Sequence, residues 1–123
     1  MTDKFNINIL SNDPMFCTSV ATECNKFGFS LTFFEEGEIG NDKLESELLS
    51  VNIIDLDIKD SNPYDIAKKL RMTSDLPIFG VFNKFNKQAQ AKAKKTGFDL
   101  VFTKSMLIKS IKRIIIHVST EQK

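Results

Sequence analysis

Three carboxylates lie at the end of one apolar run and just beyond it, in the stretch VNIIDLDIKD. The apolar residues Val51–Ile54 stop at Asp55, and Asp57 and Asp60 follow. A carboxylate at the end of a partly buried strand is costly unless a hydrogen bond or a cation satisfies it. Asp55 therefore either holds a ligand at the end of the strand or is neutralised by a neighbouring side chain.

The segments around Asp55 alternate between apolar runs and helical patterns, with no repeat and no linker. We predict five strands, at Phe5–Leu10, Phe29–Phe34, Val51–Ile54, Leu76–Phe82 and Phe98–Phe102. We predict five helices, at Pro14–Phe27, Asn41–Leu49, Asn62–Met72, Asn83–Thr96 and from Ser105 onwards. Asp13 before Pro14 and Asn62 before Pro63 are good helix caps, and Asn83 can cap a third helix.

Five strand–helix units predict an α/β fold in three layers, with a doubly wound parallel five-stranded sheet between two layers of helices. Right-handed crossovers favour the flavodoxin-like strand order 2-1-3-4-5 over a single domain, 1–123. In such sheets, sites form at the carboxyl ends of the strands, next to the point where the strand order reverses. That edge receives Ser11, Asn12, Asp13, Asp55, Phe82, Asn83, Thr103 and Lys104.

The bulk composition is that of an ordinary globular chain, with 123 residues, 41% hydrophobic and 27% charged. No apolar run approaches the roughly 18 residues that a membrane helix needs, so we expect no membrane partner. The start MTDKFNINIL lacks the features of a signal peptide, so we expect a cytoplasmic protein. The starting Met and the polar tail STEQK favour a chain that stands alone. Cys17 and Cys24 are expected to be two buried thiols, because no further ligand suggests a metal site.

The net charge of +1 conceals two halves of opposite sign. Residues 1–61 carry 4 Lys or Arg and 12 Asp or Glu, a net charge of −8. Residues 62–123 carry 13 and 4, a net charge of +9. The basic half indicates either an anionic partner or packing beside the acidic half, and a solvated face is the ordinary explanation of such a charge run.

The motifs INILSNDP, NIIDLDI, LPIFGVFN and TGFDLVFTKS, in this order, resemble the receiver domain of bacterial response regulators, the CheY-like family. The resemblance covers nearly the whole chain. It implies that Asp55 is the phosphoacceptor of a histidine kinase or phosphotransfer protein and that Lys104 contacts the phosphoryl group. It also implies an acidic pair that holds Mg²⁺ at the end of the first strand.

The sequence departs from the family's pattern at five positions. Ser11 and Asn12 stand in place of the acidic pair, Phe82 in place of a Thr or Ser, Val101 in place of the switch aromatic, and Ser105 in place of a Pro. Ser and Asn supply no negative charge, although phosphoryl transfer depends mainly on positioning and metal electrostatics. A phenyl ring at position 82 cannot donate a hydrogen bond to a phosphate oxygen, and it is expected to fill and pack the pocket instead.

These departures predict an ion pair between Asp55 and Lys104 within about 4 Å, with no metal between them. Asp13 is expected to cap its helix, while the side chain of Asp57 is expected at the rim of the pocket. Because a cis bond before a residue other than proline costs about 3 kcal/mol, we predict a trans Lys104–Ser105 bond.

We therefore interpret the chain as an atypical receiver, a pseudo-receiver, that is not an enzyme, needs no cofactor and acts by binding a protein partner. The alternative is a working receiver that is phosphorylated on Asp55 and binds Mg²⁺ weakly there. A flavodoxin-like ligand binder is a third hypothesis, but LSNDPM offers no Gly-rich phosphate loop after the first strand.

The resemblance implies that partners bind the face made by the fourth helix, the fifth strand and the fifth helix. In this chain that face carries Lys84, Phe85, Lys87, Lys92, Lys94, Lys95, Lys109, Lys112 and Arg113. It suits an acidic protein or a second copy of the chain. We expect no nucleic-acid partner, because no recognition motif is present. The fourth helix has only Phe85 and a few alanines to anchor it, so we expect it to be the least stable element.

Overall fold

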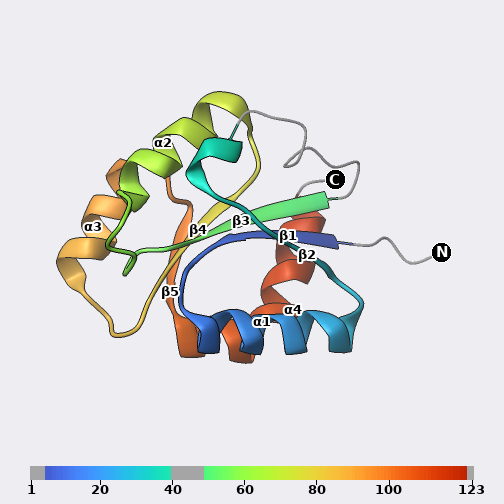
Figure 1. Cartoon of the computed structure of the whole chain (residues 1–123). Coiled ribbons are helices and arrows are strands. Elements are labelled where there is room, and N and C mark those ends of the chain that lie inside the picture. Colours follow the sequence, from blue (N-terminus) through green and yellow to red (C-terminus); the bar gives the residue numbers. More distant parts are fainter. Residues whose placement is uncertain (1–4, 40–48, 122–123) are drawn as a thin grey trace.

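The structure is a computed structural model that describes residues 5–39 and 49–121. Its strands are β1 (Phe5–Leu10), β2 (Ser30–Phe33), β3 (Leu49–Asp55), β4 (Ile78–Phe82) and β5 (Leu100–Thr103). Its helices are α1 (Pro14–Phe27), α2 (Pro63–Thr73), α3 (Lys87–Lys95) and α4 (Lys104–Glu121), with a short 3₁₀ helix, η1 (Glu36–Glu38), after β2. Figure 1 shows these elements around one sheet.

All strand pairings in the sheet are parallel, and the order is β2-β1-β3-β4-β5. This confirms the predicted fold and strand order. β1 and β3 form the centre, where the order reverses, so their carboxyl ends lie side by side. In that register Leu10 pairs with Ile54, which brings the residues after Leu10 next to Asp55.

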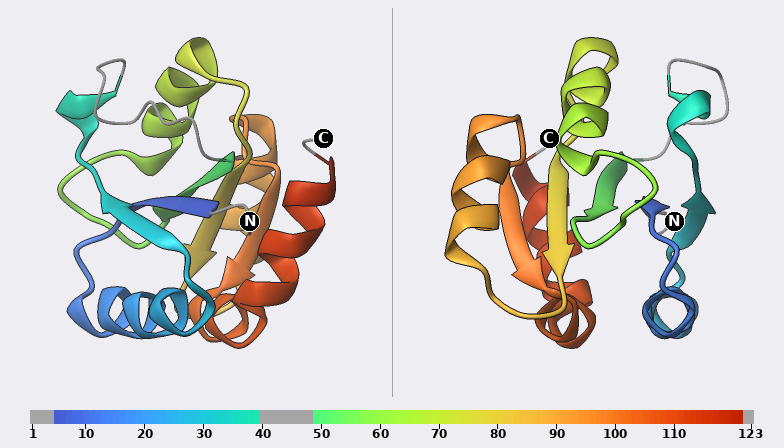
Figure 2. Two further views of the ribbon diagram at one scale, coloured as in Figure 1. Left: turned by 90° about the vertical axis from the view of Figure 1, so that its right-hand side faces the viewer. Right: turned by 60° about the vertical axis from the view of Figure 1, so that its left-hand side comes forward.

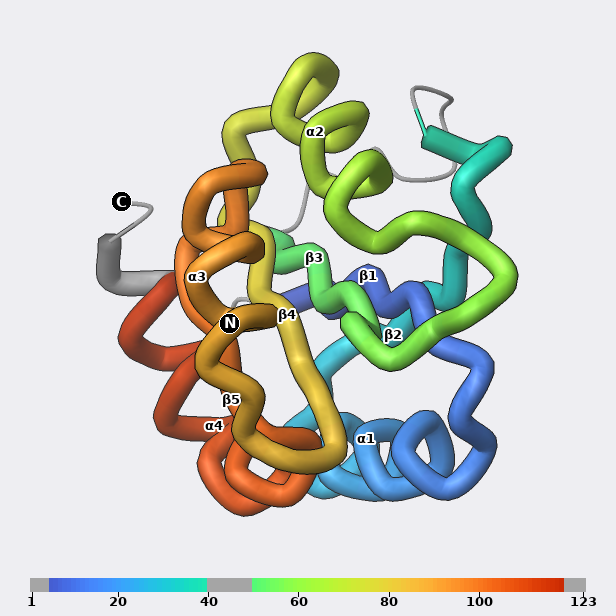
Figure 3. The backbone as a smooth tube through the Cα atoms, turned by 90° about the vertical axis from the view of Figure 1, so that its left-hand side faces the viewer, coloured from blue at the N-terminus to red at the C-terminus, as the bar shows by residue number. Residues whose placement is uncertain are grey.

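The helices form a layer on each face of the sheet, with α1 and α4 on one side and α2 and α3 on the other (Figures 2 and 3). The first core contains Ile7, Ile53 and Phe79 of the sheet beneath Val20 of α1 and Ile111 of α4. The second core packs other sheet residues against α2 and α3, including Ile54, Ile66, Ile78, Phe82, Ala93 and Phe98. Strand residues alternate between the two cores, as the pleat requires.

Two predicted helix starts are confirmed by their caps. The Asp13 side chain accepts hydrogen bonds from the backbone N–H groups of Met15 and Phe16, at 3.1 and 3.2 Å. Asn62 does the same for Tyr64 and Asp65 at the start of α2. Gly28 ends α1 with φ +74°, a conformation that glycine adopts without strain.

The predicted start of the fourth helix at Asn83 is wrong. α3 begins at Lys87, and its cap is Asn86, whose side chain accepts a hydrogen bond from the N–H of Ala89 at 3.0 Å. Asn83 lies in the preceding loop, because its N–H donates to Asp57 Oδ2 at 2.7 Å. Phe85 is consequently outside the helix and 62% exposed, so it does not anchor α3.

Other predicted bounds shift by one or two residues. β3 starts at Leu49, the residue at which the predicted helix Asn41–Leu49 was expected to end, and residues 41–48 lie outside the described part of the chain. Cys24 is buried, whereas Cys17 is half-buried, so the prediction of two buried thiols holds for Cys24 alone. Burial raises the pKa of the Cys24 thiol to about 11.

A row of hydrogen-bonded polar side chains lies within the sheet, a feature that the sequence analysis missed. Thr32 Oγ1 donates to Asn6 Oδ1 at 3.2 Å, and Asn6 Nδ2 donates to Asn8 Oδ1 at 2.8 Å. Asn8 Nδ2 then donates to Asn52 Oδ1 on the neighbouring strand, at 3.1 Å. The three asparagines are buried, so this asparagine row satisfies amide groups that would otherwise be costly to bury.

Candidate functional site

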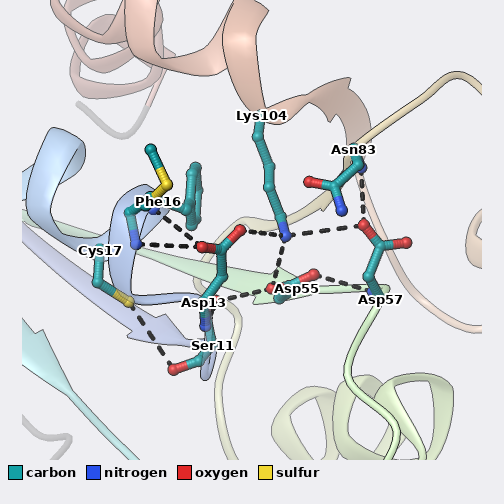
Figure 4. Close-up of polar contacts among 9 residues, drawn as sticks. Ser11, Asp13, Phe16, Cys17, Asp55, Asp57, Asn83 and Lys104 are labelled. Carbon is teal, nitrogen blue, oxygen red and sulfur yellow. Dashed lines mark hydrogen bonds and ion pairs between the residues drawn. The ribbon is translucent and has the colours of Figure 1, made fainter.

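Lys104, at the junction of β5 and α4, is surrounded by three carboxylates (Figure 4). Its Nζ lies 2.9 Å from Asp55 Oδ2, 3.0 Å from Asp13 Oδ2 and 3.7 Å from Asp57 Oδ2. Lys104 is 7% exposed and Asp55 is 1% exposed, so the shortest of these ion pairs is buried. The predicted Asp55–Lys104 ion pair is confirmed. We call these four residues, with Ser11, the Lys104 cluster.

Asp55 has both carboxylate oxygens engaged. The Ser11 hydroxyl donates to Oδ2 at 2.6 Å, the oxygen that also contacts Lys104. The backbone N–H of Asp57 donates to Oδ1 at 2.9 Å. The carboxylate that ends the apolar strand is therefore neutralised and hydrogen-bonded by its own chain.

Asp13 performs two structural tasks with its two oxygens. Oδ1 caps α1, whereas Oδ2 pairs with Lys104. The hydrogen bond from Lys104, and next the one from the backbone of Phe16, hold the pKa of the Asp13 carboxyl below its usual range. The cap of Asp13 and its place at the pocket edge were both predicted from the sequence, but its ion pair with Lys104 was not, although a carboxylate can serve a cap and a cation at once.

Asp57 joins the loop after β3 to the end of β4. Its Oδ2 accepts the N–H of Asn83 at 2.7 Å and lies within salt-bridge range of Lys104. Its side chain is 39% exposed, which agrees with the expected place at the rim. Asn83 therefore contributes a backbone group to the site.

The charge of the cluster is unbalanced, because three carboxylates surround one ammonium group. Burial acts to lower the pKa of Lys104, but the hydrogen bonds to Asp55 and Asp13 outweigh it and raise that pKa. The Phe16 ring lies beside the same ammonium, with its centroid 5.5 Å from Nζ. Lys104 thus remains charged at neutral pH, although it is almost fully buried.

The remaining predicted site residues do not complete a phosphate site. Phe82 is buried in the second core, and its ring meets the exposed ring of Phe85 edge-on, with centroids 6.0 Å apart. Val101 is half-buried and packs against the same core. Asn12 is exposed, and with Ser11 it lines a neighbouring pocket of about 370 Å³ bounded by Phe34 and Ile58. The Lys104–Ser105 bond is trans, as predicted.

A resident Mg²⁺ does not fit this donor set. Magnesium needs oxygen ligands in near-octahedral geometry and keeps several waters. The oxygens of Asp13, Asp55 and Asp57 that converge here face Lys104 Nζ, so an ammonium group stands where a cation would gather them. Among the described residues, no group of three or more His, Cys, Asp or Glu side chains is arranged to hold a metal ion.

The cations of the predicted partner face lie on two different layers. Lys92 of α3 lies over the ring of Tyr64, on the second-core side, at 4.4 Å from the centroid. Lys109, Lys112 and Arg113 of α4 lie on the other side of the sheet and line a groove with Phe27 of α1. Within residues 5–39 and 49–121, no helix is long and apolar enough to cross a membrane.

No protein-family model and no curated protein matches this sequence, but solved structures match its fold. One is the receiver domain of the Saccharomyces cerevisiae response regulator Ssk1, solved with the histidine phosphotransfer protein Ypd1. It has a TM-score of 0.80 and 16% identity, over 99% of this chain and 93% of that one. A two-component response regulator from Clostridium difficile has a TM-score of 0.73 and 18% identity, over 89% of this chain and 94% of that one.

A third similar structure is the beryllofluoride-activated NtrC4 receiver domain dimer, with a TM-score of 0.71 and 14% identity, over 92% of this chain and 98% of that one. At such identities the likeness shows the fold alone. The chain has the flavodoxin-like α/β fold of response regulator receiver domains.

Proposed function

We propose that this protein is an atypical receiver domain that signals by binding protein partners, without Mg²⁺-dependent phosphorylation of Asp55. The observation that carries the proposal is the Lys104 cluster, in which the receiver's phosphoacceptor position is neutralised by Lys104 and hydrogen-bonded by Ser11. The protein is a signalling module in the cytoplasm, and it needs neither an enzymatic activity nor a cofactor.

The chemistry of phosphoryl transfer supports this proposal. Phosphoryl transfer depends on a well-positioned acceptor and on a metal ion that neutralises the developing charge. Both oxygens of Asp55 are engaged, and the neutral Ser11 and Asn12 stand where the family has an acidic pair. Phe82 adds an apolar wall where the family has a hydroxyl group.

Partner binding is supported by the positive charge of the exposed surface and by the protein partners found with similar structures. One neighbour was solved with a histidine phosphotransfer protein, and another is a dimer. In this chain the candidate face is that of α3, β5 and α4, whose described α3 and α4 side chains up to residue 118 include no acid. An acidic protein is the partner we propose for it, rather than a nucleic acid.

A working phosphoacceptor is the second candidate, and one observation favours it. Asp13 and Asp57 bring two carboxylates back to a site whose acidic pair is missing, both within 3.7 Å of Lys104. If Lys104 swung away, these carboxylates and Asp55 would face one another.

The deciding experiment is the intact mass of the protein after incubation with acetyl phosphate and Mg²⁺. Asp55→Asn removes the acceptor, and Asp60→Asn is the matched control at an exposed carboxylate outside the Lys104 cluster. We expect no phosphate-sized gain in mass, with the fold verified by circular dichroism. A gain in the wild type and in Asp60→Asn, but not in Asp55→Asn, would establish the second candidate instead.

A further inference from the structure

The proposed function does not say where on the basic face a partner binds, and a groove of about 430 Å³ lies where the end of α1 meets the outer side of α4. The two helices lie next to each other on one face of the sheet (Figures 2 and 3). We call this surface the α1–α4 groove, and its lining residues are Phe27, Lys109, Ser110, Lys112, Arg113 and Ile116.

The groove combines exposed apolar surface with fixed positive charge. Phe27 is 37% exposed and Ile116 is 53% exposed. The ammonium group of Lys112 lies 5.3 Å from the centroid of the Phe27 ring, a cation–π distance that holds this charge over the apolar surface. A ligand in the groove would therefore meet an aromatic ring and three cations together.

These cations have no acidic neighbour nearby on their own helix, because the one acid of α4, Glu121, is its last residue. Residues 104–118 contain no Asp or Glu, and Lys109 has like charges three and four residues further on, at Lys112 and Arg113. Like charges at this spacing destabilise a helix. On α1, by contrast, Lys26 pairs with Glu23 at 2.9 Å. The α4 cations therefore suit an acid supplied from outside the helix.

We propose that the α1–α4 groove binds an acidic amphipathic segment of a partner protein, a proposal that rests on the proposed role of the domain as a protein-binding module. Carboxylates of the segment meet Lys109, Lys112 and Arg113, and its apolar side chains cover Phe27. This is the helix-in-groove mode of recognition, in which apolar anchors recur at helical spacing.

Charge repulsion argues against the groove of a second copy as the occupant. A symmetric dimer places the same patch on both sides, so these three cations would face one another. A contact between the groove and the acidic residues near Glu35 and Glu36 of a second copy would make the chain dimeric, so a dimer that Lys109→Glu with Arg113→Glu abolishes in sedimentation equilibrium would overturn the proposal. A concave groove with an aromatic wall also suits inserted side chains better than a flat layer of anionic headgroups.

The test is a selection from a displayed library of random 16-residue peptides, encoded with equal numbers of Lys and Glu codons, on the full-length chain. We expect selected peptides to be rich in Asp and Glu with apolar residues at three- and four-residue spacing. Lys109→Glu with Arg113→Glu should weaken their binding by about tenfold or more. The matched control is Lys59→Glu with Lys68→Glu, an equal charge change on exposed residues away from the groove, and it should change binding by less than about twofold.

Amide chemical shifts of the bound chain locate the contact, which should include Phe27 and residues 109–116. Neutral or basic peptides, no binder at all, equal losses in both double variants, or shifts confined to α3 would each overturn the proposal. So would binding to vesicles rich in phosphatidylserine by a chain that selects no acidic peptide. Phosphorylation of Asp55 in the mass assay would refute the proposed function. If the groove still bound acidic peptides in that case, the proposal for the groove would stand although the proposed function had failed.

Discussion

Two polar assemblies accompany the sheet, a partly buried one at its carboxyl edge and a buried one within its strands, and they satisfy their polar groups differently. The Lys104 cluster gathers ionised side chains at the carboxyl ends of β1, β3 and β5. The asparagine row places neutral amides within β1 and β3, on the face that also contributes to the second core. The cluster has two more carboxylates than cations, whereas each member of the row receives or passes on a hydrogen bond.

The difference separates a charged assembly with an excess of acid from a neutral one that fixes the strand register. The asparagine row depends on the register of β1 and β3, because Asn8 pairs directly with Asn52. A slip by one residue would turn these amides toward the apolar first core, so the row helps to specify the register. The Lys104 cluster is built from loop and element ends instead, and its excess negative charge is a cost that packing does not require.

The largest effect that would test this comparison is expected from Lys104→Met. Methionine keeps the apolar stem but removes the charge that three carboxylates share. Removing one partner of a buried ion pair leaves the other uncompensated, so we expect a loss of about 3–5 kcal/mol in the free energy of unfolding. Urea denaturation at pH 7 measures it.

Lys109→Met is the matched control for this substitution, because Lys109 is exposed on the same helix. A surface substitution of this kind should change the free energy of unfolding by less than about 0.5 kcal/mol. If the two variants were equally stable, Lys104 would not be the counter-ion on which the cluster depends.

The intermediate effect is expected from Asn8→Leu in the asparagine row. Leucine removes the acceptor of Asn6 Nδ2 and the donor to Asn52 Oδ1. Unsatisfied buried polar groups cost about 1–3 kcal/mol each in mutational series, and the added apolar burial offsets part of that cost. We expect a net loss of about 1–3 kcal/mol in the same denaturation experiment.

Thr32→Val at the outer end of the row serves as its control, since it removes a single donor that is only partly buried. It should cost about 1 kcal/mol or less. If Thr32→Val lowered the free energy of unfolding as much as Asn8→Leu, the stabilisation would come from packing on β2 and not from the hydrogen bonds of the asparagine row.

The two assemblies also show how far the sequence alone could lead. Alternating apolar segments predicted the sheet and its order, and the spacing of Asp55 and Lys104 predicted their ion pair. The second oxygen of Asp13 escaped prediction because a cap explained that residue completely, although the carboxyl end of β1 was already placed beside Asp55. Asn83 was predicted as the cap because NKFN contains two asparagines, and either can begin a helix. In the structure the backbone N–H of Asn83 donates to Asp57, so the helix begins later and Asn86 caps it.

The asparagine row was missed for a different reason. FNINIL satisfies the alternation of a strand whether its asparagines face water or the interior, since a period of two does not say which face is buried. The choice depends on a partner at the same level of β3, and Asn52 supplies it. A polar residue at matching positions of two adjacent buried strands is the signal that could have found it.

The smallest effect, and the one that separates charge from neutral hydrogen bonding, is expected from Asp13→Asn. Asparagine caps a helix about as well as aspartate, so the substitution removes mainly the ion pair with Lys104. Because the Asp13 carboxylate is partly exposed, we expect a loss of about 1 kcal/mol or less at pH 7.

The pH dependence of that loss distinguishes the ion pair of Asp13 from its helix cap. The pKa of Asp13 is lowered by folding, so its ionised form contributes stability above the unfolded-state value of about 3.8, and this contribution is lost as pH falls through the folded pKa. The difference between wild type and Asp13→Asn should therefore shrink below pH 3.8, whereas the difference for Asn8→Leu should stay constant, because no group in the row titrates. Urea denaturation at pH 7, 4 and 3 measures both differences. An Asp13→Asn deficit that persisted unchanged at pH 3 would assign the loss to the cap and remove Asp13 from the Lys104 cluster as an electrostatic partner.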